Sequence, residues 1–168
     1  MRLYLIYFFI WIVYIVMPVY SNKTFKEDLS FGKQYEEKAL KLFDYDDVVH
    51  PDGYCKEYDF VFTKNNRETR VEVKADKMAH KTGNIAIEYK SAGKPSGIAT
   101  CEADYWVHYV IDYINKEETC YKFDLSELKE KLTDCRTISA CSGKNRLYLL
   151  PLDNVEHNIY SITPFSMC

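Results

Sequence analysis

The sequence predicts an α/β domain in which a mixed central β-sheet is flanked by helices. Short runs rich in β-branched and aromatic residues recur between residues 58 and 152, and such runs are typical of strands. Amphipathic segments at 25–43 and 125–132 place apolar residues near helical spacing, which indicates helices. Strand and helix signals interspersed in this way favour a sheet with helices packed on it.

The elements can be justified in order along the chain. The segment 25–43 reads as an amphipathic helix, and Pro51, Asp52 and Gly53 after it give a strong turn signal. A short apolar strand at 58–62 and a second strand at 69–76 flank the polar turn 64–68, which predicts a hairpin. A third strand is expected at 84–89, followed by a loop at 91–97.

The second half of the chain continues the same pattern. The run 103–111 is rich in aromatic and β-branched residues, which suits a buried central strand. A further strand at 119–124 leads into a short helix at 125–132, marked by Leu125, Leu128 and Leu132, and 146–152 reads as a last strand. With 168 residues, 47% hydrophobic and 28% charged, residues 22–168 are expected to form a single domain.

The N-terminal 21 residues differ from the rest. No charged residue occurs from Leu3 to Tyr20, a length at about the minimum for a helix that spans a bilayer. Residues 1–21 are therefore expected to be an apolar helix that acts as a membrane anchor through residues 3–20 or as a signal peptide cleaved after Ser21. Translation from Met17 would instead give an intracellular protein, so localisation stays open between membrane-anchored, secreted and intracellular.

The six cysteines fit two interpretations. An even number suits disulfides in an exported protein. Cys101 and Cys120, however, lie in apolar runs, where buried free thiols are the ordinary explanation. Their spacing contains no CxxC pair, so the sequence does not predict a zinc site.

Charged residues on the predicted hairpin suggest chemistry. Successive side chains of a strand point to opposite faces, so Glu72 and Lys74 share one face of the second strand. Asp59 stands at the head of the preceding strand, where it can meet Glu72. Two close carboxylates repel unless a cation or a proton lies between them. Oxygen ligands suit Mg²⁺ or Mn²⁺, and a nearby lysine can act on a metal-bound water.

In this respect the sequence resembles the PD-(D/E)xK nuclease superfamily, which has a restriction-endonuclease-like core. The resemblance covers about residues 28–132, although the proline that gives the motif its name is absent before Asp59. It implies a divalent-metal-dependent nuclease that hydrolyses phosphodiester bonds in DNA, either branched or double-stranded. It also implies that Asp59, Glu72 and the main-chain carbonyl of Val73 bind Mg²⁺ or Mn²⁺, that Lys74 acts on water and the phosphate, and that Glu36 assists.

The loop after the third strand offers candidate contacts to DNA. The charge is −3 for the whole chain, which is unlike a general nucleic-acid binder. Lys90, Lys94 and Ser96 nevertheless form an open cationic segment, whose groups are of the kind that position phosphates without reading bases. Many enzymes of this fold that cut both strands act as dimers, so a homodimer is one expectation. The alternative functions are a nuclease-fold protein that only binds a partner, and an exported or membrane-anchored interaction domain without catalysis.

Overall fold

The computed structural model describes residues 22–52 and 55–164. The expected apolar helix of residues 1–21 and Cys168 lie outside the described residues. Within the described residues, no helix is both long and apolar enough to cross a membrane.

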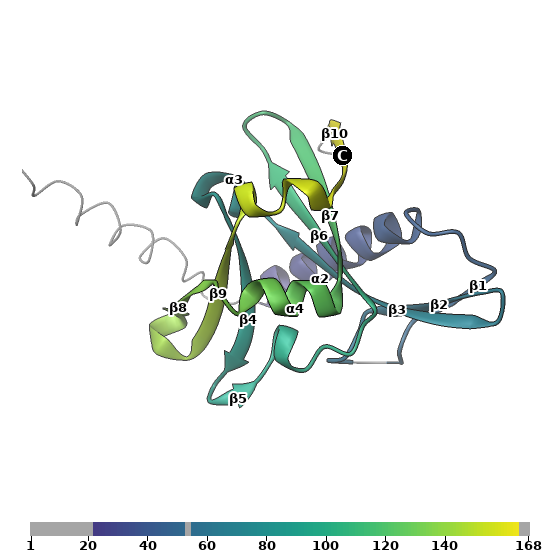
Figure 1. Ribbon diagram of the computed structural model, residues 1–168, viewed down its shortest axis with the longest axis horizontal. Coiled ribbons are helices and arrows are strands. Elements are labelled where there is room, and N and C mark those ends of the chain that lie inside the picture. Colours follow the sequence, from purple (N-terminus) through teal and green to yellow (C-terminus); the bar gives the residue numbers. More distant parts are fainter. Residues whose placement is uncertain (1–21, 53–54, 165–168) are drawn as a thin grey trace, which may run out of the picture.

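A six-stranded sheet forms the centre of the fold, with strand order β1-β2-β3-β6-β7-β10. β3 and β6 run parallel and all other neighbours run antiparallel, so the expected mixed sheet is confirmed (Figure 1). Its strands are β1 (Asp47–Val49), β2 (Phe60–Lys64), β3 (Arg67–Asp76), β6 (Tyr105–Asp112), β7 (Glu117–Asp124) and β10 (Ile159–Pro164).

A second, antiparallel sheet has strand order β5-β4-β9-β8. Its strands are β4 (Asn84–Ser91), β5 (Lys94–Pro95), β8 (Arg136–Ala140) and β9 (Asn145–Pro151). The expectation of one central sheet that includes the third strand was therefore wrong. β6 already occupies the place beside β3, and Ile85 and Ile87 of β4 bury one face against the core between the two sheets.

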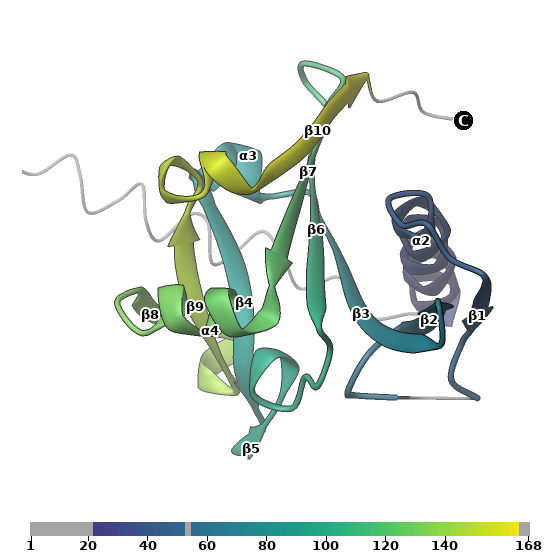
Figure 2. The ribbon, with the colours of Figure 1, turned by 45° about the vertical axis from the view of Figure 1, so that its right-hand side comes forward.

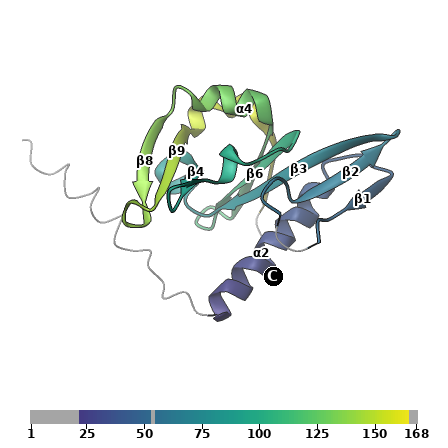
Figure 3. The same ribbon diagram turned by 90° about the horizontal axis from the view of Figure 1, so that it is seen from below.

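The helices lie on both sides of the central sheet. α2 (Asn22–Leu40) covers one face, whereas the second sheet and α4 (Leu125–Leu132) lie on the other (Figures 2 and 3). Short helical turns complete the fold, namely α3 (Ala79–Thr82) and the 3₁₀ turns η1 (Gly97–Ala99), η2 (Cys141–Gly143), η3 (Leu152–Asn154) and η4 (Glu156–Asn158). Flanking helices are thus confirmed, and α4 has the bounds expected from the sequence.

Two hydrophobic cores follow from this layering. Tyr35 and Ala39 of α2 pack on the face of the sheet that carries Val71, Val73 and Val107. The opposite face packs against β4, β9 and α4, through side chains that include Trp106, Phe123, Leu128 and Leu150. β3 is therefore covered on both faces, which is why its alternate residues 71 and 73 are buried on one side and 72 on the other.

A buried polar cluster fixes α2 on the sheet. Glu118 of β7 is 3% exposed. It accepts hydrogen bonds from the Tyr35 hydroxyl at 2.8 Å and from Lys38 Nζ at 2.7 Å. Tyr35 and Lys38 lie on either side of Glu36 on α2, so this cluster also fixes the helical turn that carries Glu36.

We expect Glu118→Ala to destabilise the protein by roughly 2 kcal/mol, because the Tyr35 hydroxyl loses its buried partner and Lys38 loses its ion pair. Urea unfolding followed by circular dichroism measures the loss. Glu117→Ala, at the exposed neighbouring position, serves as the control. Equal stability of the two variants would show that the Glu118 cluster contributes nothing to the docking of α2.

The five cysteines that the structure describes are free thiols. Cys101 and Cys120 are buried, one in each hydrophobic core, as expected for apolar surroundings. Burial raises the pKa of each of these thiols to about 11, so both are neutral at physiological pH. Among the described residues, the alternative of a disulfide-stabilised domain therefore has no support.

Candidate active site

β2 begins at Phe60, so it covers the edge of β3 only as far as Val71 and leaves the rest of that edge open. The ladder between β2 and β3 ends at the pair Phe60 and Val71, and one further hydrogen bond joins the Asp59 amide to the Val71 carbonyl at 2.9 Å. Beyond this point the Asp59 carboxylate accepts the Val73 amide at 2.7 Å. The amide and carbonyl of one strand residue point to the same side. The Val73 carbonyl therefore lies on the side of β3 that carries Asp59.

Glu72 and Lys74 extend from the face of β3 opposite α2. Their side chains form an ion pair, so the shared face expected from strand alternation is confirmed. The Glu72 side chain is 10% exposed and that of Lys74 is 43% exposed, so Lys74 is partly accessible to solvent beside a buried carboxylate. Lys74 also lies over the Trp106 ring, at 5.8 Å from its centroid.

Glu36 approaches the same region from α2. Burial raises its pKa, and the charge of Asp59 raises it further, while His50, Lys33 and Lys74 oppose this effect. His50 Nδ1 lies 3.9 Å from the Glu36 carboxylate. Because the charges of Asp59 and Lys74 both act on Glu36, Glu36 lies within electrostatic range of these two residues.

The charges of this group depend on one another. Burial raises the pKa of Glu72, and Asp59 and Glu36 add to the increase while Lys74 counteracts it. Burial alone would lower the pKa of Lys74, but the charges of Glu72 and Asp59 hold it above its ordinary value. Lys74 is therefore an ammonium ion at neutral pH. As it stands, it can stabilise negative charge but cannot take up a proton.

The donor set fits a hard divalent cation. Asp59, Glu72 and the Val73 carbonyl offer oxygen ligands around the open edge of β3, and Mg²⁺ is bound in proteins through one or two carboxylates with waters in its remaining positions. Within the described part of the chain, no three or more His, Cys, Asp or Glu side chains are gathered into a metal site. Any bound ion would thus depend on the main-chain carbonyl and on water as well as on the two carboxylates.

The three residues expected to contact DNA lie on or beside the second sheet. Lys90 of β4 and Lys94 of β5 are exposed, which leaves their ammonium groups available to phosphates. Ser96 instead donates its hydroxyl to Glu88 at 2.6 Å, and Glu88 also accepts Asn145 Nδ2 at 2.7 Å. The Ser96 hydroxyl therefore ties the loop to β4.

Gly97 permits the close approach of this loop to β4. A Cβ at position 97 would lie 2.3 Å from the Glu88 carbonyl oxygen, and its φ of +53° is in the left-handed region. Both conditions require glycine. The contacts of Glu88 thus hold the loop after Lys94 against β4, and the lack of a side chain at position 97 leaves room for this approach.

A buried histidine lies next to Lys74. His108 lies opposite Lys74 in the parallel ladder and is 3% exposed. Its Nδ1 accepts the Trp106 indole N–H at 3.3 Å, which leaves the proton on Nε2, 3.7 Å from the Asp76 carboxylate. In the sequence, His108 stands in an apolar run and looks like an ordinary core residue. Only the register of β3 and β6 places it beside Lys74.

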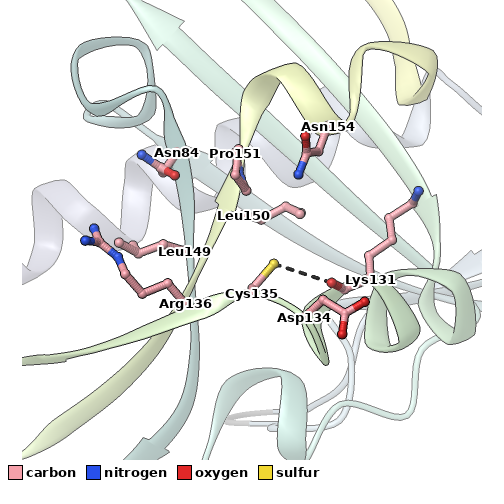
Figure 4. A pocket seen from close by; sticks show the side chains of 9 residues that line it. All are labelled: Asn84, Lys131, Asp134, Cys135, Arg136, Leu149, Leu150, Pro151 and Asn154. Atoms are coloured by element: carbon pink, nitrogen blue, oxygen red, sulfur yellow. Dashed lines mark hydrogen bonds between the residues drawn. The ribbon is translucent and has the colours of Figure 1, made fainter.

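Two pockets in the described residues lie away from this group. The first, of about 430 Å³, is formed by β8, β9 and the end of α4, where Cys135 Sγ donates to the Lys131 carbonyl at 3.4 Å (Figure 4). The second has a volume of about 800 Å³ and lies at the β2–β3 hairpin and the start of α4. Neither is lined by Glu36, Asp59, Glu72 or Lys74, so both pockets lie apart from the candidate active site.

We expect Glu36→Gln to raise the melting temperature of the metal-free protein at pH 8. The raised pKa of Glu36 means that the folded state binds a proton more readily than the unfolded state, so stability falls as pH rises through that pKa. Glutamine removes the charge, and the gain over the wild type should vanish near pH 4. Thermal melts in EDTA at both pH values test this. A control is Glu37→Gln, at the exposed neighbouring position, and a gain equal to that of Glu36→Gln would contradict the assignment.

Comparisons with known proteins give little beyond this geometry. The chain matches no protein-family model and no curated protein. Among solved structures, it is similar to a bacterial homing endonuclease, I-Ssp6803I, with 24% sequence identity and a TM-score of 0.41 over 58% of this chain and 67% of that chain. One structural neighbour is thus an endonuclease. A likeness of this extent leaves the function to be argued from the residues themselves.

Proposed function

We propose that this chain is a divalent-metal-dependent nuclease that hydrolyses phosphodiester bonds in DNA, with a site of the PD-(D/E)xK type. The observation that supports it is that Asp59, Glu72 and Lys74 all lie where β2 begins beside β3. Asp59 is held at the edge of β3 by the Val73 amide, and Glu72 and Lys74 are paired beside it. Resemblance of the motif to that superfamily supports the same assignment.

Each residue has a role in the proposed reaction. Asp59, Glu72 and the Val73 carbonyl would hold Mg²⁺ or Mn²⁺, an ion that activates water and neutralises charge on the phosphate when bound. The Lys74 ammonium stabilises the charge that develops on the phosphate oxygens. Glu36, whose pKa is raised by burial and by the charge of Asp59, is suited to assist as an acceptor of a proton from the attacking water.

Cleavage of DNA by the purified full chain tests this proposal. Supercoiled plasmid should be nicked or linearised in Mg²⁺ or Mn²⁺, and EDTA should stop the reaction. Branched duplexes and single strands, tried in parallel, would identify the preferred substrate. If neither DNA nor RNA is cleaved with either metal, the proposed nuclease activity is wrong and the alternative of an interaction domain without catalysis takes its place.

A further inference from the structure

The larger cavity, of about 800 Å³, lies where the β2–β3 hairpin meets the start of α4, and its residues on β2 and β3 belong to the face of the central sheet that carries α2. Thr69 and Tyr105 both line the cavity. In the strand ladders Thr69 lies opposite Phe62 and Tyr105 lies opposite Val71, and these two partners belong to the core under α2. These side chains share the α2 face, whereas Glu72 and Lys74 extend from the other face of β3. The cavity is therefore distinct from the candidate active site, and its volume falls in the range of about 300–1,000 Å³ that is typical of ligand sites.

A lysine without a carboxylate partner lines this cavity. Lys122 Nζ lies 4.4 Å from the centroid of the Tyr105 ring, 4.5 Å from that of Phe43 and 5.8 Å from that of Tyr160. Burial lowers the pKa of Lys122, although the charge of Asp124 opposes this. In the described structure no hydrogen bond or ion pair involves the ammonium. Its position over aromatic rings only partly replaces the water it has lost, so a bound anion would stabilise it.

The remaining charges around the cavity are also mainly positive. Lys64, Arg67 and Lys129 line it together with Lys122, against Asp104 and Asp124. Lys64 is paired with two aspartates, and Lys129 donates to the Cys101 carbonyl. Arg67 is exposed at the end of the hairpin. In a chain whose formal charge is −3, this concentration of cations beside rings is the local pattern expected of a nucleic-acid contact.

We propose that this cavity binds a phosphate of a nucleic-acid strand, with Lys122 and Arg67 as its cationic contacts and the Tyr105 and Phe43 rings beside the nucleotide. The nature of the occupant rests on the proposed nuclease function. The two sites lie on opposite faces of β3 but are close along it. Thr69 and Glu72 are about 10 Å apart along β3, and Arg67 and Glu72 about 17 Å apart. This spacing equals that of about three to five phosphates along the axis of one strand.

Binding measured without cleavage tests the proposal. The parent protein is the full chain with Lys74→Ala, and each variant carries Arg67→Ala or Lys122→Met in addition. Binding of labelled single- and double-stranded DNA is followed by fluorescence anisotropy in EDTA. Methionine keeps most of the packing of Lys122 on the rings. We expect about tenfold weaker binding for each added change, the scale of one hydrogen-bonded ion contact. We also expect the slope of log affinity against log salt to fall by about 0.7–0.9.

Lys144→Ala, at an exposed position in the turn between β8 and β9, is the matched control and should bind as the parent does. Unchanged affinity in the Arg67 and Lys122 variants would overturn the proposal, as would a parent that binds no DNA. Binding of inorganic phosphate that depends on Lys122 but does not displace DNA would assign the cavity to a free small anion and would equally overturn the proposal. This experiment measures binding alone. Failure of the proposed nuclease function is recognised in the separate cleavage assay, as a wild-type chain that binds DNA but does not cut it.

Discussion

Lys74→Ala should reduce DNA cleavage by about 10²-fold or more while DNA binding remains nearly intact. Losses of this size are usual when an electrostatic or acid–base group is removed from the reacting atoms. Lys74 is charged at neutral pH because Glu72 and Asp59 raise its pKa, and its side chain reaches solvent at the open edge of β3. Cleavage rates under single-turnover conditions, together with anisotropy for binding, separate the chemical effect from the loss of one cation.

Lys77→Ala is the matched control for this experiment. Lys77 follows the last residue of β3, and its Nζ lies over the Phe31 ring of α2, 3.7 Å from the centroid. It therefore lies on the α2 side of the sheet, away from Lys74, as strand alternation predicts. Both variants should be folded by circular dichroism. Equal activity of the two would mean that residues 70–76 form only a charged strand.

The elements near the proposed site could be predicted because their signals are local. Period-two alternation at 69–76 identified β3 and the shared face of Glu72 and Lys74, and the polar turn before it identified the hairpin. The amphipathic helix put Glu36 on the element that precedes the hairpin. Helix and hairpin are short-range features, and the packing of α2 on the sheet brings Glu36 within electrostatic range of Asp59.

The division into two sheets could not be predicted, because it depends on which distant strands pair. The sequence of β4 is equally compatible with a place beside β3 or in a separate sheet. The choice is decided by β6, which pairs with β3 in parallel, and by β9, which pairs with β4. The partners of His108 and Glu118 could not be predicted for the same reason, since Asp76 and Lys38 are far away from them in the sequence.

Asp59→Asn should abolish stabilisation by Mn²⁺ and reduce cleavage by at least about 10²-fold, because one of the two proposed carboxylate ligands loses its charge. Asparagine keeps an oxygen that can accept the Val73 amide, so the local backbone should not change. The measurements are the rise in melting temperature with added Mn²⁺, calorimetric titration of the metal, and the rate of plasmid cleavage. Excess metal should restore part of the activity if the defect lies in binding.

Asp104→Asn is a close structural match as a control. Asp104 lies directly before β6 and accepts the Arg70 amide at 2.8 Å, just as Asp59 lies directly before β2 and accepts the Val73 amide at 2.7 Å. Both aspartates therefore hold the backbone of β3, one from each side, but only Asp59 lies beside Glu72 and Lys74. If the effect of Asp59→Asn comes from metal binding, Asp104→Asn should keep the Mn²⁺-dependent rise in melting temperature. An equal loss of the Mn²⁺-dependent rise in both variants would instead show that Asp59 acts only as a support for β3.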